Sequence, residues 1–260
     1  PADIQKTVDA GELWHAAERG LLQPVDSAVL AANIPEAYRD PANRWFGFSI
    51  RARTLVYSTE RVKPEELSTY EALAEPQWKG RLCLRTSKKV YNQSLVAMLI
   101  AQHGEELTEK VVRGWVENLA TDVFANDTQL MEAIAAGQCD VGSVNTYYFG
   151  RLLRDKPEIP VKLFWADQEG SGVHVNVSGA GITAHAPHRE AAQKFLEWLS
   201  QTESQSMFAD RNLEYPANPG VKADSIVLEW GEFTPNPINL SKAGELQAAA
   251  VRLMDRAGYR

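Results

Sequence analysis

The stretch Val144-Asn145-Thr146-Tyr147-Tyr148-Phe149-Gly150 places two phenols side by side at a predicted strand-to-helix junction. In the first turn of a helix, successive side chains diverge by only about 100°, so both rings can face the same space. Phenol has a pKa of about 10 and keeps its proton near neutral pH unless a strong Lewis acid displaces it. Two converging phenolates suit a hard trivalent cation, although the pair taken alone is better explained by ordinary half-buried packing.

A second tyrosine stands in the same kind of context. Gly80-Arg81-Leu82-Cys83-Leu84 predicts a buried strand, a polar loop follows, and a helix is predicted from Ser94 to Gln102. Tyr91 lies between the loop and this helix. The chain therefore repeats the order of strand, polar segment, tyrosine and helix.

Composition excludes several classes of protein. The 260 residues include 44% hydrophobic residues and carry a formal net charge of −7. No apolar run of about 18 residues could span a membrane, and an acidic balance argues against a nucleic-acid partner. The five histidines are scattered without H-E-x-x-H spacing, and we find no catalytic constellation, so we expect no enzyme.

Strand-like and helix-like segments alternate along the chain, which predicts an α/β fold. The two long predicted strands cover residues 45–58 and 173–183. We expect Thr108 and Asp127 to act as N-caps of two of the helices. The predicted helices cover residues 10–19, 68–73, 94–102, 108–119, 127–137, 187–200 and 246–257.

Tyr91-Asn92-Gln93-Ser94, preceded by Arg85 and Ser87 and followed by Asn145-Thr146-Tyr147-Tyr148, resembles the bacterial periplasmic ferric-iron-binding proteins of ABC transporters. The resemblance covers essentially the whole chain. Further matching segments are Thr7–Gly11, Arg51–Arg53, Ala136–Asp140, Glu214–Pro219 and Met254–Gly258.

The resemblance implies a two-lobed periplasmic-binding-protein fold of class II type, with hinge strands and an interlobe cleft. Residues 1–48 and 176–260 would form the lobe built from the chain ends, and residues 49–175 the central lobe that carries the tyrosines. The two long strands would be the crossovers, and ligand would bind in the cleft as the lobes close.

The resemblance also implies a ligand set for the metal. Tyr91, Tyr147 and Tyr148 would bind Fe3+, and three phenolates would balance its formal charge. Carbonate or another synergistic anion would complete the shell. Some family members use a glutamate near Asp9, but Val8 in this chain cannot bind metal, and the first-strand histidine or tyrosine of other members is also missing.

Five polar residues are candidates for an anion site or for support of the ligands. Arg51 and Arg53 share one face of a strand, so they either reach the cleft or form an exposed basic face. Arg85 and Ser87 either bind an anion at the following helix N-terminus or serve loop and capping roles. We favour a helix-capping role for Asn145 over direct ligation.

Cys83 and Cys139 each precede a tyrosine of the predicted site by eight residues. If Tyr91 and Tyr147 converge from neighbouring strands, the two cysteines can also lie close together. We therefore predict a disulfide, which suits an oxidising compartment, with two buried free thiols as the alternative.

Together these features predict a periplasmic monomer that captures Fe3+ and delivers it to an inner-membrane ABC permease. The start at Pro1-Ala2-Asp3 resembles the middle of a family member, so we expect a missing N-terminal segment. One alternative is a solute-binding protein that holds a small oxyanion through Arg51, Arg85 and Ser87. Another is the ligand-sensing domain of a regulator, although no helix-turn-helix pattern is visible.

Overall fold

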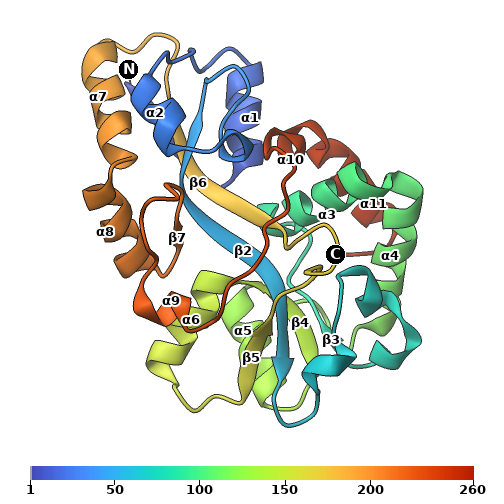
Figure 1. Ribbon diagram of the computed structural model, residues 1–260. Helices are drawn as coiled ribbons and strands as arrows, with labels where there is room; N and C mark the ends of the chain where they lie inside the picture. The colour runs from blue at the N-terminus through green and yellow to red at the C-terminus, as the bar shows by residue number, and fades with distance from the viewer. Residues whose placement is uncertain (1) are drawn as a thin grey trace. The chain divides into compact units, whose positions relative to one another are not determined.

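Strand β2, Phe46–Ser58, is buried along all 13 of its residues and passes through two structural units (Figure 1). The computed structural model describes residues 2–260. Unit 1 contains the chain up to Arg51 together with Val175–Gly231 and Pro237–Glu245. Unit 2 contains Ala52–His174, Glu232–Asn236 and Leu246–Arg260. The chain therefore crosses between the units within β2 and just before β6, and it crosses again around residues 232–236 and at Leu246.

Unit 1 is built on antiparallel strands. β1 pairs with β6, β6 lies next to β2, and β7 pairs with the first half of β2. Helix α1 packs against both β6 and α10. The elements of this unit besides β2 are β1 (Ile4–Thr7), α1 (Ala10–Glu18), α2 (Ala28–Asn33), η1 (Glu36–Tyr38), β6 (Val175–Ile182), α7 (Arg189–Leu199), α8 (Thr202–Asn212), β7 (Tyr215–Pro216), α9 (Ser225–Leu228) and α10 (Ser241–Glu245).

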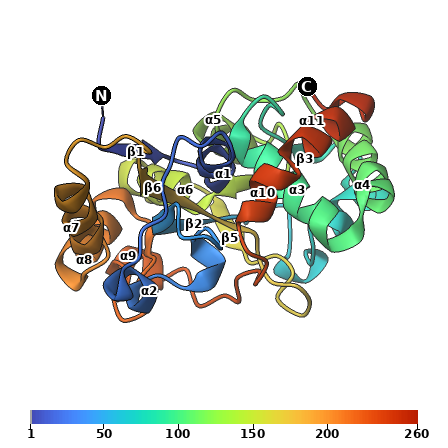
Figure 2. The ribbon, with the colours of Figure 1, turned by 90° about the horizontal axis from the view of Figure 1, so that it is seen from above.

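Unit 2 has a mixed sheet in the order β5-β2-β4-β3, in which only β3 and β4 are parallel. Helices α3, α4 and α11 lie side by side in both ribbon views (Figures 1 and 2). The elements of this unit besides β2 are η2 (Pro64–Glu66), η3 (Glu71–Ala74), η4 (Pro76–Trp78), β3 (Leu82–Cys83), α3 (Val90–His103), α4 (Glu105–Asn118), α5 (Asp127–Ala135), β4 (Val141–Asn145), α6 (Thr146–Asp155), β5 (Val161–Phe164) and α11 (Gln247–Arg256).

The last helix belongs to unit 2, whereas the expected division placed residues 176–260 entirely in the lobe of the chain ends. α11 packs on α3 and α4, where Leu253 and Met254 are buried. An amphipathic pattern shows that one face of a helix is buried but does not show which partner covers it. The sequence alone therefore could not assign this helix to its unit.

Three local expectations differ from the structure. α4 begins directly after Gly104, and Thr108 lies inside the helix, where its hydroxyl donates to the Gly104 carbonyl over 2.8 Å. Asn126, and not Asp127, is the N-cap of α5, and its side chain accepts from the Gln129 N–H over 2.9 Å. The helix expected at residues 68–73 is the short 3₁₀ turn η3.

Tyr70 joins two segments of unit 2 that lie next to two of the crossings between the units. Its hydroxyl donates to the Arg53 carbonyl over 2.5 Å and accepts from the His174 N–H over 3.0 Å. The Arg53 N–H also donates to the His174 carbonyl over 2.9 Å. Burial raises the pKa of the Tyr70 phenol, so the hydroxyl stays a donor at neutral pH.

The predicted disulfide is confirmed. Cys83 and Cys139 are bonded with their Cα atoms 5.9 Å apart. Cys83 ends β3, and Cys139 lies two residues before β4, so the parallel pairing of these strands brings the two sulfurs together.

Candidate metal centre

Tyr147 and Tyr148 open helix α6 directly after strand β4 ends at Asn145. Their ring centroids lie 4.4 Å apart with the ring planes at 35°. The first N–H groups of a helix have no partner within the helix, and together they favour negative charge at this end. Both phenols therefore belong to the first turn of α6, at the positive end of the helix dipole.

Tyr91 lies in the first turn of α3, and the Tyr147 hydroxyl donates to the Tyr91 hydroxyl over 3.3 Å. The two helices follow strands β3 and β4, which run parallel, so both segments leave the sheet at the same edge. Residues that bind ligands in α/β sheets commonly gather at this edge. The sheet thus brings together two tyrosine segments that are more than fifty residues apart.

Arg85 supplies a positive charge beside the tyrosines. Its guanidinium carbon lies 5.3 Å from the ring centre of Tyr91 and 5.6 Å from that of Tyr148. Burial lowers the pKa of Arg85, but the charges of Asp127, Tyr148 and Tyr91 raise it more, so the guanidinium stays charged. At these distances the guanidinium can interact with the faces of both rings.

Tyr147 is 8% exposed, and this burial raises the pKa of its phenol, with the neighbouring Tyr91 hydroxyl adding to the effect. The Tyr147 proton is therefore retained at neutral pH until a strong Lewis acid replaces it. Arg151, one helical turn further along α6, lies 5.0 Å from the centre of the Tyr147 ring. The i,i+4 spacing of Tyr147 and Arg151 was visible in the sequence but was not identified.

Arg53 is 2% exposed and faces into unit 2, so the alternative of an exposed basic face is excluded for it. Its guanidinium donates to the side chains of Asn92, Asn145 and Asp127 and to the Ser143 carbonyl. Asn145 occupies the N-cap position of α6, but its side chain does not cap the helix, because its amide oxygen accepts from Arg53 over 3.0 Å.

Arg51 and Ser87 lie in different units. Arg51 is buried in unit 1, where its guanidinium donates to the Val8 carbonyl and, over 3.3 Å, to the Ser178 hydroxyl. Ser87 is in unit 2 and uses its N–H to donate to the Arg260 carbonyl over 3.0 Å. Of the five candidate supporting residues, Arg53, Arg85 and Asn145 are joined in one network with Asp127, while Arg51 has its bonds in unit 1.

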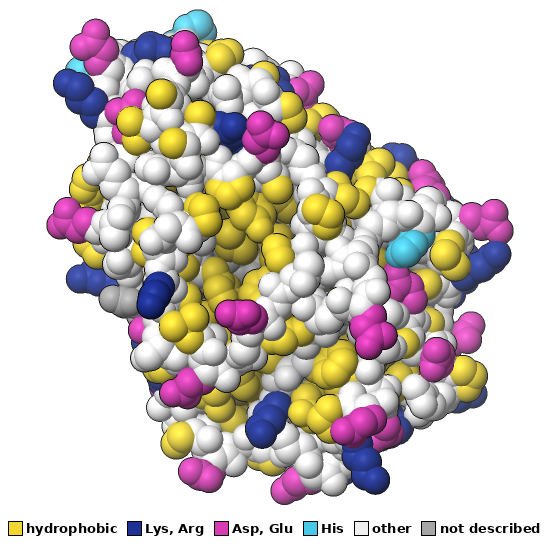
Figure 3. Space-filling model, in the orientation of Figure 1, with side chains coloured by type: hydrophobic (Ala, Val, Ile, Leu, Met, Phe, Trp, Pro, Cys, Tyr) yellow, Lys and Arg dark blue, Asp and Glu magenta, His cyan; other side chains and the backbone are white. Residues whose placement is uncertain are grey.

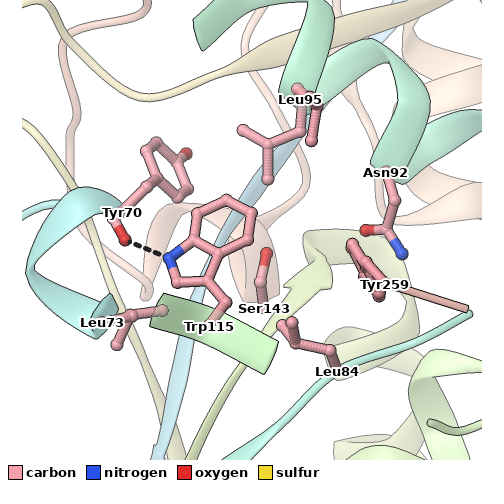
Figure 4. Close-up of a pocket in the computed structure, with 9 residues that line it drawn as sticks. Tyr70, Leu73, Leu84, Asn92, Leu95, Trp115, Ser143 and Tyr259 are labelled. Carbon is pink, nitrogen blue, oxygen red and sulfur yellow. Dashed lines mark hydrogen bonds between the residues drawn. The ribbon is translucent and has the colours of Figure 1, made fainter. Parts of the chain in front are cut away.

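A small cavity of about 10 Å³ lies within unit 2 beside this network (Figure 4). Asn92 and Tyr259 lie on one side of it, and Tyr70 and Trp115 lie on the other, where the Trp115 indole N–H donates to the Tyr70 carbonyl over 2.8 Å. The buried Tyr259 hydroxyl donates to the Arg85 carbonyl over 2.6 Å. The end of the chain thus supports the loop that leads to Tyr91, a contact between residues 174 positions apart that no local pattern indicates.

The donor set available here consists of oxygen atoms. Among the side chains that the structure describes, no group of three or more His, Cys, Asp or Glu residues is arranged to hold a metal ion. Phenolate oxygens are hard ligands, which favour a hard cation over soft thiophilic metals. The tyrosine cluster is therefore the best candidate for a metal centre in the described part of the chain.

A family model described as bacterial extracellular solute-binding protein matches residues 2–232. The chain belongs to this family. It is 46% identical over 266 residues to iron uptake protein A1 of Synechocystis, a match that covers 100% of this chain and 74% of that protein.

Two solved structures extend the comparison. A Trichodesmium protein in complex with iron and citrate is 46% identical, with a TM-score of 0.97 over 100% of this chain and 84% of that one. The open Mannheimia haemolytica ferric iron-binding protein A is 35% identical, with a TM-score of 0.94 over 100% and 83% of the two chains. The expected family and the two-lobed α/β fold are confirmed.

The description of this family is of extracellular proteins that bind solutes. None of the helices in the described part of the chain combines the length and the apolar character needed to cross a membrane. On the face drawn in Figure 3, basic side chains are scattered among acidic ones and do not form a continuous basic surface.

Proposed function

We propose that this protein binds Fe3+ in the periplasm through the phenolate oxygens of Tyr91, Tyr147 and Tyr148 and delivers it to an inner-membrane ABC permease. The contact between the Tyr147 and Tyr91 hydroxyls, 3.3 Å apart on two helix starts, is the observation that carries this proposal. The curated relatives are iron uptake and ferric-iron-binding proteins, which supports the same cargo.

Capture of the ion exchanges protons for metal. Each phenol loses its proton as Fe3+ binds, and three phenolates together match the charge of the cation. The helix N-termini and the Arg85 guanidinium stabilise the phenolates once they form. Because burial raises the pKa of Tyr147, a weakly acidic divalent ion is a poorer competitor for this site than Fe3+.

A synergistic anion completes the coordination shell in this proposal. Fe3+ accepts more than three ligands, and carbonate or a carboxylate such as citrate offers the hard oxygen atoms that the ion prefers. The Trichodesmium relative was solved with iron and citrate together, which supports an anion at the corresponding place.

The oxyanion-only alternative has less support. It relied on Arg51, Arg85 and Ser87 as anion ligands, but Arg51 already donates to the Val8 carbonyl and Arg85 already donates to the Ala125 carbonyl and to Asp127. The tyrosine cluster would have no role in such a protein.

The decisive experiment replaces Tyr91, Tyr147 and Tyr148 singly with phenylalanine, which preserves ring packing and removes only the oxygen. We expect each variant to lose iron in competition with a chelator at fixed pH and fixed carbonate, and to weaken the visible phenolate-to-iron absorption. Tyr57→Phe is the control, because Tyr57 pairs with Val141 at the start of β4, whereas Tyr147 follows its end. Unchanged competition curves for all three variants would end the assignment. Uptake of radioactive iron by vesicles that contain the permease tests delivery separately.

A further inference from the structure

We propose that Asp127 is a positioning residue that fixes the distance between the two helix starts bearing Tyr91 and Tyr147. The expected effect of Asp127 on iron affinity rests on the proposed function above. Asp127 is fully buried, although as the first residue of α5 its side chain was predicted only to cap that helix. Its carboxylate contacts Asn145, which precedes the Tyr147 segment, and Arg85, which lies in the loop before Tyr91.

The first contact is to the segment of Tyr147. The Asp127 Oδ2 atom accepts from the backbone N–H of Asn145 over 2.9 Å. Asn145 is the last residue of β4 and directly precedes α6, so this bond fixes the backbone from which both Tyr147 and Tyr148 project. Because the bond is to the backbone, it constrains where α6 begins.

The second contact runs through Arg53. Asp127 Oδ2 lies 3.2 Å from Arg53 Nη1, which also donates to the Asn145 amide oxygen over 3.0 Å. The Arg53 Nε atom donates to the Asn92 amide oxygen over 2.9 Å. Asn92 is the neighbour of Tyr91, so one guanidinium connects both tyrosine segments and is oriented by Asp127.

The third contact is to the loop before Tyr91. Asp127 Oδ1 lies 3.4 Å from Arg85 Nη1, and the Arg85 Nε atom donates to the Ala125 carbonyl over 3.1 Å. The Asn92 amide nitrogen donates to the carbonyls of Arg85 and Thr86 over 2.8 and 3.0 Å, which closes the loop onto the start of α3. Asp127 thereby holds the cation that lies over the tyrosine rings.

Charge explains why this carboxylate is difficult to replace. Arg53 and Arg85 are 2% and 4% exposed, so two guanidinium ions are buried around one carboxylate. Buried ions whose partner is removed keep their desolvation cost without compensation. Replacing Asp127 with asparagine preserves the shape but leaves two buried cations facing a neutral amide, and we expect them to separate and to move Asn92 and Asn145 with them.

A positional effect can be distinguished from a simple field effect. Exchange of Fe3+ for three phenol protons is neutral in formal charge, whereas the synergistic anion adds negative charge to the site. A change of charge that acts only through its field therefore alters iron affinity mainly through the anion, whereas displacement of Tyr91 from Tyr147 reduces the affinity at every anion concentration. Outer-shell partners of metal ligands commonly alter affinity by about 10–100-fold.

The experiment compares Asp127→Asn with Asp140→Asn. Asp140 also bridges two arginines in unit 2, through Arg61 Nε at 2.7 Å and Arg81 Nε at 2.6 Å. It lies directly before the start of β4, however, whereas Asp127 contacts the end of that strand. Each variant is measured by iron competition, by the phenolate-to-iron absorption band, and by NMR of [¹³Cζ]tyrosine in the iron-free protein. We expect Asp127→Asn to weaken iron binding by about tenfold or more, to shift the band, and to shift the resonances of Tyr91 and Tyr147. Asp140→Asn should lower the melting temperature without these changes.

Equal losses in both variants, or unchanged affinity and spectra in Asp127→Asn, would overturn the proposal. If the parent protein binds no iron, the proposed function fails, and the NMR comparison of the two iron-free variants still decides the positioning role. If Asp127→Asn does not fold, Asn92→Ala removes the link from Arg53 to the Tyr91 segment without a change of charge. It should move the Tyr91 resonance, and an unmoved resonance contradicts the proposal.

Discussion

The hydroxyl of Tyr147 donates a hydrogen bond to the hydroxyl of Tyr91 over 3.3 Å. The proton of this bond lies between two oxygens that the proposed function assigns to one iron ion. Both hydroxyl protons must leave before the two oxygens bind the metal, so the contact links iron capture to pH. Four predictions follow from this contact and from three other features of unit 2.

Iron affinity should decrease as the pH falls. The pKa of Tyr147 is raised by burial and by Tyr91, so the iron-free protein holds protons that binding must release. Each released proton changes the apparent affinity by about tenfold per pH unit. Chelator competition between pH 6 and pH 8 should give a slope for Tyr91→Phe that is about one proton lower than for the parent. Identical slopes would show that Tyr91 releases no proton when iron binds.

Removal of the disulfide should destabilise the fold. Cys83 and Cys139 are separated by 56 positions, for which the chain-entropy model gives a contribution of about 4 kcal/mol. Urea denaturation of the double variant Cys83→Ser, Cys139→Ser should show a lower midpoint than the oxidised parent. A reductant should lower the midpoint of the parent and leave that of the variant unchanged. Equal midpoints for the oxidised parent and the variant would contradict the prediction.

Replacing Asp167 with asparagine should stabilise the protein above neutral pH. Burial, together with the negative charge of Glu71, raises the pKa of Asp167 to about 7 in the folded state. The folded protein therefore binds a proton more tightly than the unfolded chain, and this carboxyl makes stability decline as the pH rises from about 4 through about 7. Asparagine lacks this titration and can still accept the Tyr70 N–H.

Thermal denaturation of the parent and Asp167→Asn at several pH values measures this effect. The difference in melting temperature in favour of the variant should grow between pH 4.5 and pH 8. A change of 1 kcal/mol corresponds to about 2–4 °C for a domain of 150–250 residues. A difference that is constant with pH would show that Asp167 does not titrate in this range.

Gly142→Ala should destabilise unit 2. A methyl group at this position of β4 would lie 2.7 Å from the Cys83 carbonyl oxygen and 2.7 Å from a Leu130 methyl carbon. Overpacking of a closely packed site costs about 1–3 kcal/mol. Gly170→Ala is the control, because its added methyl group would meet only the Asp167 carbonyl oxygen at 3.9 Å. Chemical denaturation should separate the two variants, and equal stability would contradict the expected clash.

The three tyrosines could be identified from the sequence because each lies where a strand gives way to a helix, and such junctions gather at one edge of a sheet. The long strand expected at residues 45–58 is β2, Phe46–Ser58. It could be predicted because many of its side chains have strong β propensity. Pattern and resemblance together located the candidate site and the fold.

The supporting network could not be predicted in this way. Asp127 matches the pattern of an N-cap. A local pattern cannot show that its carboxylate instead accepts a hydrogen bond from Arg53, which is 74 residues away. Tyr259 likewise reaches Arg85 only through the packing of α11 on α3. Contacts of this kind depend on tertiary structure, which overrides the local preference of a residue.

The hydroxyl of Tyr70 has a mechanical consequence. It bonds to Arg53 and to His174, and these two residues also bond to each other, with Arg53 two residues after one chain crossing and His174 directly before another. Two strands joined side by side resist twisting more than either strand alone. Inside the unit that carries the tyrosines, the two segments are therefore fixed to each other by three hydrogen bonds, almost up to the boundaries at Ala52 and His174.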